Sequence, residues 1–225
     1  MFRRNIRSCN GRQVVNFKLS AAGFPKTAMT IGIFDGVHRG HQALIKRVVS
    51  HNASVSSDSL IPVIITFREN EELRANGVLS ELPSHKHKNS MTLGNIQSFQ
   101  ERLEIFEQLG AEITLVIDFT ESFRRIRGIE FLETLNKHGN IGFFAVGSGF
   151  RCGYQLDTDA AAIRDYFVSR NIQVEIVPEV MEGTLPISSS RIRAAIANGD
   201  LLLAQSMLGE AVSVKKLMYN PNNPS

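Results

Sequence analysis

The fold is decided around the segment Ile31-Gly-Ile-Phe-Asp-Gly-Val-His-Arg-Gly-His-Gln42. An apolar run over Ala28–Phe34 stops in a Gly/Asp turn, and apolar residues return at helical spacing from Leu44 to Val49. This order predicts a strand, a turn and then a helix over Gln42–Ser50. The first N–H groups of a helix lack intrahelical partners and lie at the positive end of its dipole. The segment therefore predicts an anion site at a strand-to-helix turn.

The same alternation of strand-like and helical patterns continues along the chain. Apolar runs that are continuous rather than alternating indicate parallel strands covered on both faces. We therefore predict an α/β fold with a Rossmann-like, open, doubly wound parallel sheet, whose ligands bind outside the carboxyl ends of the strands. Strands are expected at Ala28–Phe34, Leu60–Phe67, Ile113–Phe119, Phe143–Gly147 and Gln173–Pro178, and helices at Gln42–Ser50, Asn95–Leu109, Ile129–Asn136, Asp159–Arg170, Ser188–Ala197 and Asp200–Leu208.

Composition excludes several classes of protein. The 225 residues suit one large domain over 1–212, followed by a turn-rich, flexible tail over 213–225. No window approaches the ~20 apolar residues of a membrane span, and the arginine-rich start lacks the apolar run of a secretory signal. Two cysteines are too few for a disulfide framework. A cytoplasmic protein without a membrane partner is expected, and a net charge of only +3 disfavours nucleic acid as a partner.

Two histidines carry the predicted chemistry. In His38-Arg-Gly40-His41 a glycine lies between two imidazoles at the helix start. Imidazoles that can become two-donor cations suit phosphate oxygens, and donors directed at developing charge are the main contribution a protein makes to nucleotidyl transfer. The alternative interpretation is a solvated histidine pair; the surrounding strand, turn and helix favour the functional one.

A second anion site is predicted at Ile187-Ser-Ser-Ser-Arg-Ile-Arg193. Ser188 and Ser189 are good N-caps for a helix, and Arg193 lies one turn into it. Serine hydroxyls, helix N–H groups and a guanidinium together suit the β- and γ-phosphates of a triphosphate. Alone, this pattern is also typical of an ordinary capped helix with a surface arginine.

Together the two motifs resemble the adenylyltransferase module of bacterial FAD synthetases, which are HxGH nucleotidyltransferases. The resemblance implies that the chain transfers AMP from ATP to FMN, giving FAD and pyrophosphate, with Mg²⁺ accompanying ATP and no metal held by the protein alone. The chain ends too early for the riboflavin kinase module that such proteins usually carry, so an adenylyltransferase module alone is expected. The resemblance covers Met29 to Leu208 and includes Phe119-x-x-x-Phe123, Glu130-Phe131 and Val146-Gly147.

The resemblance also assigns roles to individual residues. It implies that His38 and His41 stabilise charge in the transition state, and that Ser188, Ser189 and Arg193 hold the leaving pyrophosphate. The remaining expected nucleotide-binding residues, which shape the turn and the neighbouring strand end, are Gly32, Phe34, Asp35, Gly40 and Gly147.

The chain departs from the family pattern on the flavin side. Where the family usually has Pro-His-Pro, this chain has Arg68-Glu-Asn-Glu-Glu72, and its Val146–Gly153 segment carries Gly149 and Cys152 at two characteristic positions. Two alternatives therefore stay open: the same mechanism with another phosphate acceptor, or a catalytically silent protein that binds nucleotide or flavin. The polar stretch Arg68–Met91, with His85 and His87, is expected to be either a lid or a solvated surface loop. Oligomeric state is left open.

Overall fold

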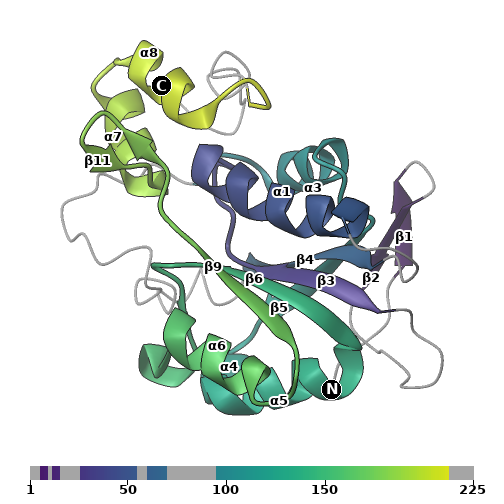
Figure 1. The fold of residues 1–225 in the computed structure, drawn as a ribbon. Helices are drawn as coiled ribbons and strands as arrows, with labels where there is room; N and C mark the ends of the chain where they lie inside the picture. The colour runs from purple at the N-terminus through teal and green to yellow at the C-terminus, as the bar shows by residue number, and fades with distance from the viewer. Residues whose placement is uncertain (1–5, 10–11, 16–25, 55–59, 70–94, 213–225) are drawn as a thin grey trace.

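The computed structural model describes residues 6–9, 12–15, 26–54, 60–69 and 95–212 of the chain (Figure 1). The expectations for the 213–225 tail, for His85 and His87, and for most of the 68–91 stretch lie outside the described residues. The described ranges contain both predicted anion motifs and every predicted strand.

A seven-stranded sheet forms the centre of the protein (Figure 1). All neighbouring strands are parallel except the first pair. From β3 the chain adds β4 and then β5 on one side, and β6 and β9 on the other, so the strand order reverses between β3 and β6. In spatial order the strands are β1 (Ile6–Cys9), β2 (Arg12–Val15), β5 (Ile113–Phe119), β4 (Ile61–Glu69), β3 (Thr27–Ile31), β6 (Ile141–Gly147) and β9 (Gln173–Val177).

Helices cover both faces of this sheet. On one face lie α1 (Arg39–Ser54) and α3 (Phe99–Gln108), and on the other lie α4 (Glu121–Arg124), α5 (Gly128–Gly139) and α6 (Ala160–Val168) (Figure 1). The two-residue period of the strands divides the core accordingly. Phe143 packs into the cluster under α1, whereas the next residue, Phe144, packs into the cluster under α5 and α6.

After β9 the chain forms a small hairpin, β10 (Met181–Glu182) with β11 (Leu185–Pro186), and then α7 (Ser189–Ala197) and α8 (Leu201–Leu208). Apolar side chains of α7 and α8 join the core cluster of α1, so this C-terminal unit packs on the α1 face. Between β6 and α6 in the chain, the short strands β7 (Arg151–Cys152) and β8 (Thr158–Asp159) pair on either side of the 3-10 turn η3 (Tyr154–Leu156).

The predicted α/β architecture with a doubly wound parallel sheet is confirmed, and several element boundaries are corrected; the helix predicted over Asn95–Leu109, for example, begins at Phe99. The first predicted strand ends at Ile31 rather than Phe34, because Phe34 already has the positive φ of 55° that belongs to the turn. The following helix begins at Arg39 and continues to Ser54, beyond the predicted Gln42–Ser50. Sequence patterns gave no indication of β1, β2 or the β10–β11 hairpin, which are all very short.

Candidate functional site

The turn between β3 and α1 is strained. Phe34, Gly36 and Val37 have φ values of 55°, 83° and 31°, a region that bulky and β-branched residues rarely adopt. Such conformations persist only where surrounding contacts hold them, and they concentrate at functional sites. Here the ring of Phe34 is completely buried, and it packs edge-on against His41 with the ring centroids 5.2 Å apart. The strained turn therefore fixes one face of the histidine pair.

The two histidines form one unit. Their rings stack with centroids 3.7 Å apart and an interplanar angle of 16°. The backbone N–H of His41 donates to Nδ1 of His38 at 3.3 Å. Because that nitrogen accepts, neutral His38 carries its proton on Nε2. Gly40 permits this arrangement, since a Cβ at that position would come within 3.1 Å of the His38 ring.

Burial keeps both imidazoles neutral. It lowers the pKa of His38 to about 4, and it lowers the pKa of His41 well below its ordinary value, with the charges of His38 and Arg102 adding to the effect. At neutral pH each ring in the ligand-free protein therefore offers one N–H donor, rather than the two of the expected cation. The Nδ1 atom of His41 is buried without a hydrogen-bond partner among the described residues. Such an atom is a natural contact for a polar ligand.

Asp35 connects the two predicted anion motifs. One carboxylate oxygen accepts from the backbone N–H of Ile96 at 2.9 Å, and the other accepts from the guanidinium of Arg193. Its backbone carbonyl accepts from the Ser189 hydroxyl at 2.8 Å. Asp35 and Arg193 are only 5% and 9% exposed. The first turn of α7 is thus held against the turn that precedes α1, as the two-sided site requires.

The predicted residues of α7 have different positions. Ser188 is the N-cap, and its hydroxyl accepts from the backbone N–H of Arg191. Ser189 contacts the Asp35 carbonyl, and Arg193 pairs with the Asp35 carboxylate, so in this structure both bind the protein itself. The buried Nε of Arg193 has no hydrogen-bond partner among the described residues. Asp35 consequently has a larger role than the turn-shaping one expected from the sequence.

The other predicted glycines lie on both sides of the switch in strand order. Gly32 follows β3, and a Cβ there would come within 3.0 Å of the Phe34 ring. Gly147 ends β6, the neighbour of β3, and a Cβ added to it would meet no atom within 4 Å. Ligands of doubly wound sheets bind in the crevice at this switch point. Gly147 therefore borders open space where a nucleotide is expected, although no hydrogen bond joins it to the histidine turn.

Sequence inspection missed two residues of this region. Arg102, from α3, is 5% exposed and donates to the carbonyl of Ile33 at 2.7 Å. Gln42, in the first turn of α1, donates to the carbonyls of Val37 and Leu208 at 2.8 and 2.7 Å. Arg102 could have been recognised because it is a basic residue on the same helix face as the buried Ile105 and Phe106.

The carboxyl ends of β4 and β5 have a different character. Arg68 and Asp118 form an ion pair at 2.6 Å, with both side chains 47% exposed. Beside them, the half-buried rings of Phe67, Phe119 and Phe123 pack together with centroids 5.7 to 6.1 Å apart. Among the described residues no three His, Cys, Asp or Glu side chains cluster as a metal site requires.

The amino-acid sequence is similar to a known family and to curated proteins. A family model described as FAD synthetase matches residues 21–191. The bifunctional riboflavin kinase/FMN adenylyltransferase of Escherichia coli (strain K12) is 27% identical over 197 residues, covering 87% of this chain and 58% of that protein. Its Bacillus subtilis (strain 168) counterpart is 28% identical over 200 residues, covering 87% and 57%. The chain thus spans less than two thirds of the length of these relatives.

A solved structure shares the fold. A Streptococcus pneumoniae protein described as a macrolide-efflux protein aligns with a TM-score of 0.66 and 29% identity, over 83% of this chain and 56% of that one. None of the helices in the described part of this chain has both the length and the apolar character that crossing a membrane requires.

Proposed function

This chain belongs to the FAD synthetase family, and on that premise we propose that it transfers AMP from ATP to FMN, giving FAD and pyrophosphate. The observation that carries the proposal is the Asp35 bridge, which holds the Ser188–Arg193 turn of α7 beside His38 and His41. A triphosphate bound between the two helix starts meets N–H donors from both sides.

The proposed reaction is a direct displacement. A phosphate oxygen of FMN attacks the α-phosphorus of ATP, and the bond from that phosphorus to the bridging oxygen breaks as pyrophosphate leaves. Nε2–H of His38 donates to the negative charge that builds on the phosphate oxygens, and His41 acts beside it. Ser188, Ser189 and the start of α7 bind the pyrophosphate end. Mg²⁺ would enter as part of the ATP substrate, held by the phosphate oxygens, and would neutralise part of their charge.

FMN as the acceptor is supported by the aromatic group at the strand ends. Phe67, Phe119 and Phe123 are half-buried, and they lie at or just beyond the carboxyl ends of β4 and β5, where ligands of this fold bind. A flavin ring is flat and aromatic, and phenyl rings stack favourably with such groups.

A second candidate acceptor is a different organic phosphate, such as a sugar or alcohol phosphate. The observation that favours it is the exposed Arg68–Asp118 pair, a charged and hydrated group at the end of β4. A small polar acceptor would tolerate that surface better than the edge of a flavin would.

Turnover tests the proposal directly. Purified protein with MgATP and FMN is expected to form FAD and pyrophosphate in equal amounts, measured by chromatography and by a coupled pyrophosphate assay. Formation of pyrophosphate only with another phosphate would select the second acceptor. If ATP and FMN both bind, as seen by thermal shift, while no pyrophosphate forms, the protein is a silent binder and the enzymatic proposal fails.

A further inference from the structure

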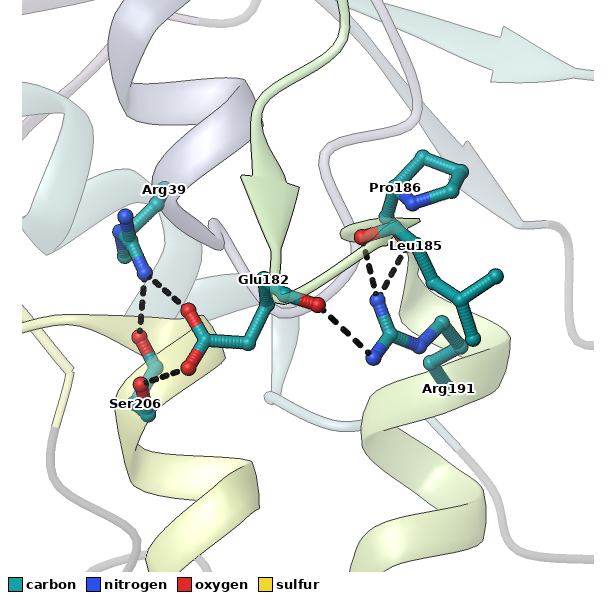
Figure 2. Close-up of polar contacts among 6 residues, drawn as sticks. All are labelled: Arg39, Glu182, Leu185, Pro186, Arg191 and Ser206. Carbon is teal, nitrogen blue, oxygen red and sulfur yellow. Dashed lines mark hydrogen bonds and ion pairs between the residues drawn. The ribbon is translucent and has the colours of Figure 1, made fainter.

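The side chain of Glu182 connects the β10–β11 hairpin to α1 and α8. Its carboxylate accepts from Arg39 at 2.5 Å and from the Ser206 hydroxyl at 2.5 Å, so it joins α1 and α8 (Figure 2). The hydrogen bonds from Ser206 and Arg39 hold the pKa of Glu182 below its ordinary value, so the carboxylate is ionised at neutral pH. Arg39 also donates to the backbone carbonyl of Ser206 at 3.2 Å.

The other side of the hairpin is fastened to α7. The guanidinium of Arg191 donates to the carbonyls of Leu185 and Pro186 at 2.8 and 2.7 Å, and to that of Glu182 at 3.5 Å (Figure 2). Arg191 therefore holds both strands of the hairpin to the helix that carries Ser188 and Ser189. With its three described acceptors, this arginine is committed to the protein backbone.

Arg39 and Arg191 each lie in the first turn of a helix that contributes to the proposed site. Arg39 is the first residue of α1 and directly follows His38, and Arg191 is the third residue of α7. The hairpin thus connects the first turn that carries the histidines with the first turn that carries the serines. We propose that Glu182 is a positioning residue for AMP transfer, which sets the spacing of these two turns by binding Arg39 with its side chain and Arg191 with its backbone.

This inference rests on the proposed function, and it concerns geometry rather than stability. The side chains of Arg39 and Glu182 are 39% and 24% exposed, and ion pairs with that much solvent contribute little to unfolding free energy. Small displacements of groups around a reacting centre, in contrast, can lower turnover by about 10²-fold. Loss of Glu182 is therefore expected to change nucleotide binding and turnover far more than thermal stability.

The chain offers a matched control in the same helix. Arg47 of α1 forms an ion pair with Glu175 of β9 at 2.8 Å, and those side chains are 58% and 34% exposed. Glu175→Ala removes a glutamate from an α1 arginine without touching the hairpin. It is expected to leave the kcat and the KM for ATP unchanged.

The test compares Glu182→Ala, Arg39→Ala, their double variant and Glu182→Gln with that control. MgATP affinity by calorimetry and the kinetic constants for ATP and FMN are measured in each. Each alanine variant is expected to weaken MgATP binding about tenfold or more while the KM for FMN stays constant. The double variant is expected to match the single ones, because both remove the same contact. Glu182→Gln, which keeps an acceptor for Arg39, is expected to recover most of the loss.

Additive effects of the two alanine substitutions, a Glu182→Ala variant indistinguishable from Glu175→Ala, or a Glu182→Gln variant as impaired as the alanine would each overturn the positioning role. Failure of the proposed function has a different signature. In that case the wild-type protein forms no FAD, while the comparison of MgATP affinities still decides whether Glu182 sets the site.

Discussion

The proposed site has a nucleotide half around Asp35 and Arg193 and an acceptor half around Arg68 and Asp118, and the two halves differ in how the fold holds them. In the nucleotide half, Asp35 and Arg193 form an ion pair whose side chains are 7% and 10% exposed. In the acceptor half, the Arg68–Asp118 pair has both side chains 47% exposed. The first half is fixed by the fold before any ligand arrives, whereas the second presents charges that water already solvates. The departure from the family's Pro-His-Pro begins at Arg68, in the acceptor half.

Asp35→Ala is expected to have the largest effect on stability. It removes the acceptor of a buried guanidinium, and breaking a buried pair from one side costs about 3–5 kcal/mol. It also removes the acceptor of the Ile96 N–H. Urea denaturation measures the loss of unfolding free energy.

The acceptor half supplies the control for this prediction. Asp118→Ala removes the exposed partner of Arg68 and is expected to cost about 0–1 kcal/mol in the same experiment. Similar losses of unfolding free energy for the two variants would contradict the distinction between the buried Asp35–Arg193 pair and the exposed Arg68–Asp118 pair.

His41→Ala is expected to separate catalysis from binding in the nucleotide half. A donor that strengthens as charge develops contributes to the transition state more than to the bound substrate. FAD formation should fall by about 10²–10³-fold while MgATP affinity stays nearly constant. The matched control is His51→Ala, which removes an imidazole from the other end of α1 and should turn over normally. Equal losses of turnover and affinity would instead make His41 an ordinary substrate contact.

The buried histidine pair also predicts a pH dependence of stability. Burial lowers the pKa of His38 from 6.5 to about 4, so between those values the unfolded chain binds more protons. The stabilisation is complete above pH 6.5 and is lost as the pH falls toward 4, by roughly 3 kcal/mol for His38. Urea denaturation between pH 4 and 7 measures this slope.

Removing the imidazole should remove its part of the slope. His38→Gln is expected to show a shallower dependence in that range, with His51→Gln as the control from the same helix. A slope that is unchanged in His38→Gln would mean that other groups carry it.

Short-range sequence patterns were enough to predict the parts of the site that are formed within one segment of the chain. The strand before the turn and the helix after it follow from apolar periodicity, and Ser188 caps α7 as its residue type and position predict. The turn itself could not be placed, because Phe34 has high strand propensity and only its burial under the helices holds it at positive φ.

The contacts between residues far apart in the chain could not be predicted from the sequence. Arg193 meets Asp35 across 158 positions, Glu182 meets Arg39 across 143, and Arg102 meets Ile33 across 69. No local period encodes such pairs; they follow from strand order and helix packing. The sequence therefore identified two segments that the fold brings together, but it did not predict that Arg193 would be committed to Asp35.

Gly147→Ala is expected to give the smallest effect, and it tests where the two halves meet. Because an added Cβ would contact no atom within 4 Å, the ligand-free protein should keep its unfolding free energy. A nucleotide lying against the end of β6 would meet the new methyl group, so MgATP affinity should fall by up to about tenfold, or 1.4 kcal/mol. Calorimetry with MgATP and with FMN, in separate titrations, shows which ligand binds more weakly to the variant. Weaker binding of FMN alone would move Gly147 from the nucleotide half to the acceptor half, and unchanged binding of both would remove it from the site.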